Sequence, residues 1–513
     1  MLVSLTFMKT ESPLPVQTGP IASPARRVTI WLKRSLLLLT LLLCSLRFSY
    51  LNADFPNNSP WSVDQAKFTD EGWWANAAVM HYVVGHWNIP GDYNPAVAVP
   101  IWPLLLTAIF HFTGVNILAA RATSVAISIA TMAIVFVLVR RYSRSGSDLP
   151  AILSALLLAA SPFGFVFSRL AILDSSVVFQ FCLLLLIASF ISNTSWIPFA
   201  TLAPLIPVLI LTKTTALALL PAVFWIAWAA MKPRLTSYLR ATLLLCACVA
   251  LTLSIYVAVV FSHGFGPDYL NFFSVNLPGE IPWRRSPEII AGIFRDSLWI
   301  DPILCPLALL VAIGAALRAR RLWSNPLLVA SWIAIVCQAI FIFTRQNDYP
   351  PRYFLAMLAP IVIAIVLAVD EFKLSHRRAY SLTMLAIAIL LIVNITTILS
   401  FQRNRTYQFY GAATSIANIV KGDPGHNRLI LGVSGSQLSL MTGLPSINDA
   451  YGTQDLGSKL LAYRPGWYLV WHEIPPNEPA LSPFQFKKVA TYTVFDDDDR
   501  NPLILYRMEQ RSR

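Results

Sequence analysis

The feature that most constrains the fold of this chain is its succession of long apolar segments between residues 35 and 400. An α-helix rises 1.5 Å per residue, so about 20 apolar residues cross a hydrocarbon core about 30 Å thick. Hydrophobic residues make up 56% of the chain and charged residues only 13%. We therefore predict an α-helical polytopic membrane protein with about 11 transmembrane helices plus interfacial helices. The predicted spans are 35–50, 117–139, 149–167, 174–192, 196–212, 214–230, 241–261, 299–317, 325–343, 353–370 and 379–400.

Clusters of Lys and Arg between these segments predict the topology. They are Arg26, Arg27, Lys33 and Arg34; Arg140, Arg141 and Arg144; Lys232, Arg234 and Arg240; Arg318, Arg320 and Arg321; and Lys373, Arg377 and Arg378. Cytoplasmic loops carry such an excess. The net charge of +13 therefore indicates topology, and no nucleic acid is expected as a partner. All clusters fall on one side if residues 96–112, which contain Pro100 and Pro103, lie in the membrane interface instead of crossing it.

This topology predicts three parts of the chain. Residues 1–30, rich in Pro, Ser and Thr, form a disordered cytoplasmic N-terminus. Residues 31–401 form a transmembrane domain with outer loops at 51–116 and 262–298. Residues 402–513, where strand-like and helical patterns alternate, form a small C-terminal extracytoplasmic α/β domain. Short loops and the lack of a retention signal favour a multi-pass protein of the plasma membrane, namely a bacterial inner membrane.

Acidic residues occur in two of the predicted outer segments. The stretch FTDEGWWANAAVMH places Asp70 and Glu71 just beyond the first span. Trp74, Ala78 and Tyr82 follow at helical spacing, which predicts a short helix at headgroup level. Further along the chain, Asp174 occupies another outer turn.

Four cations lie at outer span ends, against the bias of all the other loops. They are Arg169, Lys213, Arg345 and Arg352. Their repetition predicts that the outer end of the bundle holds an anion, for which a lipid-linked phosphate is the obvious candidate. Arg grips phosphate through two parallel hydrogen bonds, and Lys acts as a point charge.

Four acids at the same level would complete a substrate-binding site with these cations, namely Asp70, Glu71, Asp92 and Asp174. Such a site suits transfer of a group from a phosphate to a hydroxyl or amine. A carboxylate takes the acceptor's proton, and the cations stabilise the charge that develops on the departing phosphate. No hydrolase triad, phosphate loop or zinc signature occurs in the sequence. We therefore expect no cofactor, and a divalent cation is not indicated.

Four motifs occur in order between residues 30 and 400: FTDEGWWANAAVMH, FSRLAILDSS, LTKTTALALLP and PPRYFLAMLAP. Together they resemble the GT-C superfamily of integral-membrane glycosyltransferases. The resemblance is greatest to the branch with dolichyl-phosphate-mannose protein mannosyltransferases and the bacterial aminoarabinose transferase of lipid A. It implies a polyprenyl-phosphate-linked sugar as donor, inverting transfer on the outer side, and a protein, glycolipid or polysaccharide acceptor.

The resemblance also implies roles for individual residues. Asp70 would be the catalytic base or orient the acceptor, and Asp174 would be the second acid. Lys213 and Arg352 would bind the phosphate, with Tyr353 beside them in the same motif.

One segment departs from the family pattern. Many relatives carry His or Lys before a Pro-Pro pair, whereas this chain has GDYNPAVAVPIWP, with Asn94 before a single proline. Asp92 and Tyr93 are therefore candidate substitutes for a substrate contact made there.

Structural alternatives exist for the acidic residues. Asp70 and Asp174 could each cap the helix that follows. Glu71 could be a solvated residue that complements the helix dipole. Arg169 could form a structural ion pair with Asp174.

Two other functions compete with glycosyl transfer. A transporter or lipid flippase would place charges through the depth of the bilayer, and an inactive scaffold would need no acidic pair. Lys213 and Arg352 could also simply reach the phosphates of bulk lipid. Glycosyl transfer requires that Asp70, Asp174 and both cations meet around one cavity.

Overall fold

The computed structural model describes residues 24–56, 65–192, 197–231, 234–276, 324–345, 351–375, 377–474, 478–496 and 500–511, with isolated positions between 287 and 310. The predicted span 299–317 therefore lies almost wholly outside the described residues. The predicted N-terminal segment 1–30 is described only from residue 24, and the outer loop 262–298 only to residue 276 and at position 287.

The membrane bundle and the segments beside it contain many helices. They are α1 (Pro24–Leu46), η1 (Gln65–Lys67), α2 (Asp70–Val83), η2 (Pro95–Val97), α3 (Ile101–Thr113), α4 (Ile117–Tyr142), α5 (Leu149–Ala160), α6 (Pro162–Phe167), α7 (Asp174–Ala188), α8 (Ile197–Thr212), η3 (Thr214–Leu219), α9 (Leu220–Met231), α10 (Leu235–Ser262), α11 (Gly266–Asn276), α14 (Pro326–Arg345), η6 (Pro351–Phe354), α15 (Leu355–Ser375) and α16 (Arg377–Arg403). Within the described ranges, seven helical segments are long and apolar enough to cross a membrane. The prediction of a helical, multi-pass membrane protein is confirmed.

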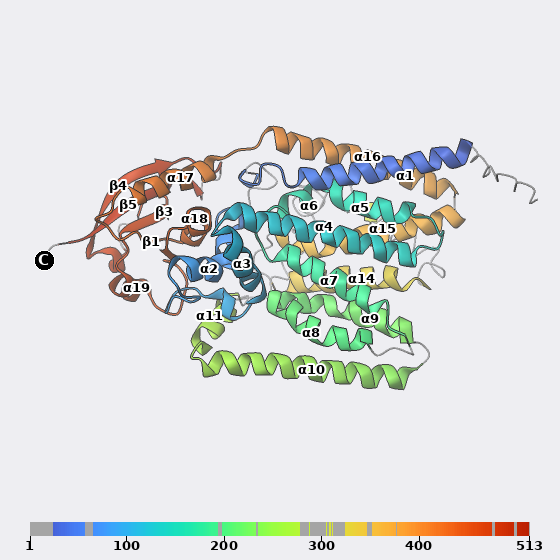
Figure 1. The fold of residues 1–513 in the computed structure, drawn as a ribbon, viewed down its shortest axis with the longest axis horizontal. Coiled ribbons are helices and arrows are strands. Elements are labelled where there is room, and N and C mark those ends of the chain that lie inside the picture. Colours follow the sequence, from blue (N-terminus) through green and yellow to red (C-terminus); the bar gives the residue numbers. More distant parts are fainter. Residues whose placement is uncertain are drawn as a thin grey trace, which may run out of the picture.

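The helices of the bundle differ greatly in burial. Helix α15 lies at the centre of the bundle, because 94% of the most apolar 18-residue stretch of Pro351–Leu374 is buried. Helix α10 lies at the edge of the bundle (Figure 1), and only 11% of its most apolar 18-residue stretch is buried. Its exposed leucines, such as Leu243 and Leu244, form the kind of surface that faces lipid.

One predicted span is two helices instead of one. The segment 149–167 divides into α5 and α6 at Ser161. Pro162 has no N–H to continue the helical ladder. The Ser161 side chain also accepts a hydrogen bond from the Gly164 N–H at 3.0 Å, which caps a new helix. The prediction of an unbroken helix here was wrong.

The predicted interfacial segment 96–112 forms η2 and α3. Helix α3 packs on α2 and also contacts α4 and α8. Figure 1 shows α2 and α3 at the end of the bundle next to the C-terminal domain, whereas α1 begins at the opposite end. We call the first of these the domain end of the bundle.

The C-terminal domain combines helices with one mixed sheet. Its elements are α17 (Gln408–Lys421), β1 (Ile430–Leu431), α18 (Gly435–Thr442), β2 (Ser446–Ile447), α19 (Leu456–Tyr463), β3 (Trp467–Trp471), η7 (Pro479–Leu481), β4 (Phe484–Tyr492) and β5 (Leu503–Gln510). The strand order is β2-β1-β3-β5-β4. Strand β1 pairs in parallel with β2 and β3, and the other pairings are antiparallel. The predicted small α/β domain is confirmed.

Candidate active site

An ion pair joins α2 to the start of α15. The Nη2 atom of Arg352 lies 2.7 Å from Oδ2 of Asp70, and the two side chains are only 7% and 2% exposed. Asp70 is the first residue of α2, and Thr69 occupies the N-cap position. The alternative that Asp70 is the N-cap residue is therefore wrong. Two predicted site residues far apart in the sequence meet in this pair.

A second ion pair joins α7 to the turn after α8. The Nζ atom of Lys213 lies 2.5 Å from Oδ1 of Asp174, and both side chains are mostly buried. Helix α7 begins at Asp174, with Leu173 at the N-cap position, so the capping alternative is also wrong here. Asp174 holds Lys213, not Arg169.

The ring of Tyr353 lies between the two ion pairs. The Lys213 Nζ atom is 4.5 Å from the ring centroid, and the Arg352 Cζ atom is 5.1 Å from it. A cation over an aromatic face is attracted by the ring quadrupole. Asp70, Arg352, Tyr353, Lys213 and Asp174 therefore form one group at the domain end of the bundle, which we call the ion-pair cluster.

A small cavity adjoins this cluster. Its polar lining comes from Asp174, Lys213, Thr215, Gln338 and Tyr353, and the remaining lining includes Val177, Leu219, Phe341, Ile342 and Ala356. A mostly apolar cavity with a few convergent polar groups is typical of ligand sites. The cluster thus lies beside a small cavity that combines charged and apolar lining.

Glu71 faces a different set of partners. Its carboxylate accepts two hydrogen bonds from Arg121, at 2.8 and 2.6 Å, and one from the Ala171 N–H at 2.8 Å. The side-chain amide of Gln437, in α18, donates a further bond at 3.0 Å. Glu71 is 0% exposed, so the alternative of a solvated residue is wrong. The carboxylate joins α2, α4, the turn before α7 and the C-terminal domain.

Asp92 also connects the two domains. The Nζ atom of Lys459, in α19, lies 3.1 Å from Asp92 Oδ1, and the Asn448 N–H donates to the same oxygen at 3.0 Å. Burial raises the pKa of Asp92, while the charge of Lys459 opposes this shift. Asp92 therefore lies outside the ion-pair cluster, and its predicted contact with substrate stays a prediction.

Tyr93, by contrast, lies near the cluster. Burial raises its pKa, a hydrogen bond with Asn276 opposes the shift, and the negative charge of Asp70 raises it further. The sequence placed Asp92 and Tyr93 together as substitutes for one family motif. The structure separates them, because neighbouring residues of an irregular segment point in different directions.

Of the other two predicted cations, Arg169 lies away from the cluster and makes different contacts. Arg169 donates to the carbonyl oxygens of Ser49 and Tyr50, at 2.8 and 2.7 Å. The predicted alternative pairing of Arg169 with Asp174 is wrong. Arg345 ends α14, and its side chain lies outside the described part of the chain.

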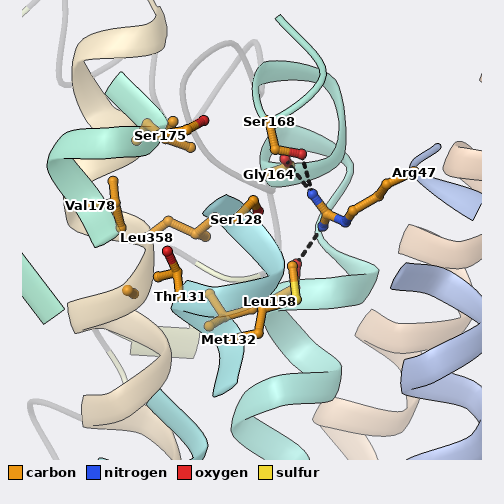
Figure 2. A pocket seen from close by; sticks show the side chains of 12 residues that line it. Arg47, Ser128, Thr131, Met132, Leu158, Gly164, Ser168, Ser175, Val178 and Leu358 are labelled. Atoms are coloured by element: carbon orange, nitrogen blue, oxygen red, sulfur yellow. Dashed lines mark hydrogen bonds between the residues drawn. The ribbon is translucent and has the colours of Figure 1, made fainter. Parts of the chain in front are cut away.

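Arg47 is a buried cation that sequence reasoning missed. It is 0% exposed and donates to the carbonyl oxygens of Leu158, Ala159 and Gly164 at 2.7–3.1 Å and to the Ser168 hydroxyl. Figure 2 shows its guanidinium at one side of a cavity that Thr131, Met132 and Leu358 also line. Because α5 ends at Ala160, Arg47 satisfies carbonyl groups that have no partner within that helix. Its contacts are those of a residue that joins α1 to α5 and α6.

Comparisons with known proteins identify the fold. No known sequence family and no curated protein matches the chain. Among solved structures, ArnT from Cupriavidus metallidurans bound to undecaprenyl phosphate matches with a TM-score of 0.58 and 15% identity, over 93% of this chain and 98% of ArnT. The apo state of ArnT matches with a TM-score of 0.59 and 15% identity, over 94% of this chain and 98% of ArnT.

A second enzyme has a similar structure. The Archaeoglobus fulgidus oligosaccharyltransferase, in complex with Zn and sulfate, matches with a TM-score of 0.52 and 12% identity, over 92% of this chain and 75% of that protein. Both neighbours are members of the GT-C superfamily. At these identities the likeness concerns the fold, and this chain has the GT-C fold.

Proposed function

We propose that this protein is an integral-membrane glycosyltransferase. It transfers a sugar from a polyprenyl phosphate to an acceptor at the domain end of the bundle, which we assign to the outer face of a bacterial inner membrane. The N-terminus is then cytoplasmic and the C-terminal domain extracytoplasmic. The observation that carries the proposal is the meeting of Asp70, Asp174, Lys213 and Arg352 around one tyrosine. Of these four, Asp174 and Lys213 also line the adjoining cavity, whereas Asp70 and Arg352 do not. The GT-C fold, shared with an enzyme solved with undecaprenyl phosphate, supports the same class of reaction.

The proposed donor site lies at Lys213 and Arg352 and at the cavity beside Lys213. The phosphate binds at these two cations, and the first isoprene unit lies against the apolar lining of the cavity. Each cation is balanced by one carboxylate, which limits the cost of burying it. When the donor phosphate binds, its negative charge replaces part of the charge with which the two carboxylates neutralise these cations.

The proposed reaction is a single displacement. The acceptor oxygen attacks the anomeric carbon from the face opposite the phosphate, and the bond from that carbon to the phosphate oxygen breaks. The lipid phosphate leaves with the electron pair, and Lys213 and Arg352 stabilise its charge. Asp70 accepts the acceptor's proton, and the anomeric carbon is inverted. These cations supply the positive charge at the leaving group, so the proposal invokes no metal or cofactor.

Asp70 is assigned as the base because its partner Arg352 is a proposed phosphate ligand. Binding of the phosphate then weakens the hold of Arg352 on the Asp70 carboxylate and leaves it able to accept a proton. Asp174 instead lines the donor cavity with Lys213. Its assigned role is to orient Lys213 toward the phosphate.

The alternative of a transporter or flippase is less well supported. It needs ionisable groups along a path through the bilayer. The two ion pairs at Tyr353 lie together at the domain end, beside a cavity whose remaining lining is mostly apolar.

The test is release of lipid phosphate by purified protein incubated with a panel of polyprenyl-phosphate sugars and candidate acceptors. We expect release with at least one pair and a large loss of activity in Asp70→Asn. Glu473→Gln, at an exposed carboxylate of the C-terminal domain, serves as a matched control. No release with any donor, or full activity in Asp70→Asn, would refute the mechanism.

A further inference from the structure

The C-terminal domain is fixed directly onto α2. The Gln437 side chain accepts a hydrogen bond from the Gly72 N–H at 2.7 Å while it donates to Glu71. The indole N–H of Trp73 donates to the Val433 carbonyl at 3.2 Å. The approach at Gly72 is so close that a Cβ atom there would lie 2.1 Å from the backbone nitrogen of Gln437. The domain therefore has one defined position relative to Asp70.

A second contact fixes the segment 448–452 of this domain. Lys459 donates to the carbonyl oxygen of Asn448 at 2.7 Å and to that of Tyr451, while it pairs with Asp92. The carbonyl of Gly452 accepts from the Asn271 side chain at 3.2 Å. Lys459 is only 1% exposed. The buried ion pair thus determines where Tyr451 lies.

Tyr451 completes a group of three aromatic rings. Its centroid lies 5.4 Å from that of Trp73 and 5.8 Å from that of Tyr93, and those two rings are themselves 5.4 Å apart. Tyr93 is 5% exposed, whereas Tyr451 is 36% exposed. The group, which we call the aromatic triad, therefore extends from the neighbourhood of Asp70 to the solvent.

Within the described part of the chain, two buried amides beside the triad have polar atoms without a hydrogen-bond partner. Asn76 lies one helical turn after Trp73 on α2, and its Oδ1 atom has no partner among the described residues. The Oδ1 atom of Asn448 accepts from the Tyr451 N–H at 2.9 Å, but its Nδ2 atom has no partner in the ranges that the structure describes. The two residues are only 4% and 2% exposed. Buried polar groups are normally satisfied, so one free acceptor and one free donor here indicate a polar ligand.

We propose that the aromatic triad binds a saccharide ring of the acceptor, with Tyr451 as a specificity-determining residue supplied by the C-terminal domain. This inference rests on the proposed function and names the acceptor's chemical class. Flat aromatic faces fit the C–H faces of a sugar ring, and the two amides can meet its hydroxyl groups. The two amides alone would also suit a peptide backbone, so the choice of a saccharide rests on the three aromatic rings.

We assign the acceptor, and not the donor, to the triad because the three rings lie away from the proposed donor cavity. None of the three rings lines the cavity beside Asp174 and Lys213. Asp70 borders both sites, since it pairs with Arg352 of the ion-pair cluster and precedes Trp73 of the triad by three residues on α2. A proton acceptor between donor and acceptor sites is the arrangement that the displacement requires.

The test is direct binding of the full-length protein, in detergent and without donor, to an array of fluorescent oligosaccharides and peptides. We expect wild type to bind at least one oligosaccharide. Tyr451→Ala is expected to bind it about tenfold more weakly, and Tyr451→Phe should retain most of the affinity. Tyr82→Ala removes a tyrosine of similar exposure from the other end of α2 and should bind as wild type does. In turnover, Tyr451→Ala should raise the acceptor KM and leave the donor KM unchanged.

Each other outcome is decisive. Binding of no saccharide, binding of peptides alone, or equal binding by Tyr451→Ala would overturn the proposal. A normal melting curve for Tyr451→Ala excludes misfolding as the cause of lost affinity. Because the binding arm needs no donor, saccharide binding without any lipid-phosphate release would refute the proposed function and leave this inference standing.

Discussion

Replacing Glu71 with Gln should strongly destabilise the protein. Gln has nearly the same size but no charge, and its single carbonyl oxygen cannot replace two carboxylate oxygens that accept four hydrogen bonds. Arg121, only 6% exposed, would lose its carboxylate partner. Removing one member of a buried ion pair costs about 3–5 kcal/mol, and two charge-assisted hydrogen bonds of about 1.5–3 kcal/mol each give a similar sum.

The expected loss lies near the lower end of this range. Arg121 keeps its hydrogen bonds to the carbonyls of Leu51 and Ala53, at 2.6 and 2.9 Å, so its charge is not left bare. We expect the free energy of unfolding to fall by about 3 kcal/mol. Denaturant titration of the detergent-purified protein, followed by tryptophan fluorescence, measures this change. Cleavage by protease between α16 and α17, at residues 404–407, should also become faster, because the hydrogen bond from Gln437 to residue 71 holds the C-terminal domain less tightly.

A control variant and a double variant test whether the loss of stability comes from the buried ion pair. Glu473 is exposed and paired with Lys488 at the surface, so Glu473→Gln should unfold as wild type does. The double variant Glu71→Leu with Arg121→Met removes both charges and should recover much of the lost stability. If Glu71→Gln is as stable as Glu473→Gln, the carboxylate does not join these elements and our reasoning about it is wrong.

Three further changes test the site and the domain contact. Asp70→Asn should lower the single-turnover rate of lipid-phosphate release by about 10²–10⁴-fold, as expected for loss of a general base; a drop in donor affinity alone would contradict that role. Lys213→Met should raise the donor KM by about ten- to a hundredfold, measured with donor titrations, and an unchanged KM would exclude a phosphate contact. Gly72→Ala should loosen the C-terminal domain, because the added Cβ atom overlaps the backbone of Gln437; protease sensitivity equal to that of wild type would show that the contact relaxes without cost.

The sequence predicted the ion-pair cluster because of a strong physical restriction. Charges are costly at the ends of apolar spans, so their repetition there indicated a shared site. It could not predict which acid pairs with which cation. Asp174 pairs with Lys213 and not with Arg169, because the pairing depends on how α7 packs against α8. That packing is determined by many apolar contacts and leaves no short motif in the sequence.

Two residues that organise the site were missed for different reasons. Arg121 lies within the predicted span 117–139, and a charge inside an apolar segment signals a buried partner, so it could have been found. Lys459 gave no such signal. A lysine on a short helix of a water-exposed domain is normally solvated, and only the packing of α19 against residues 91–93 buries it.

The two adjacent acids of α2 show how closely the site and the domain contact are connected. Successive residues of a helix point about 100° apart, so Asp70 faces Arg352 while Glu71 faces Arg121 and Gln437. One carboxylate belongs to the ion-pair cluster and is the proposed base, and the other is fully used in anchoring. Because a single peptide bond joins them, the position of the proposed base depends on the contact that holds the C-terminal domain. A loosened domain would therefore move Asp70 away from Arg352 as well as remove Tyr451 from the aromatic triad.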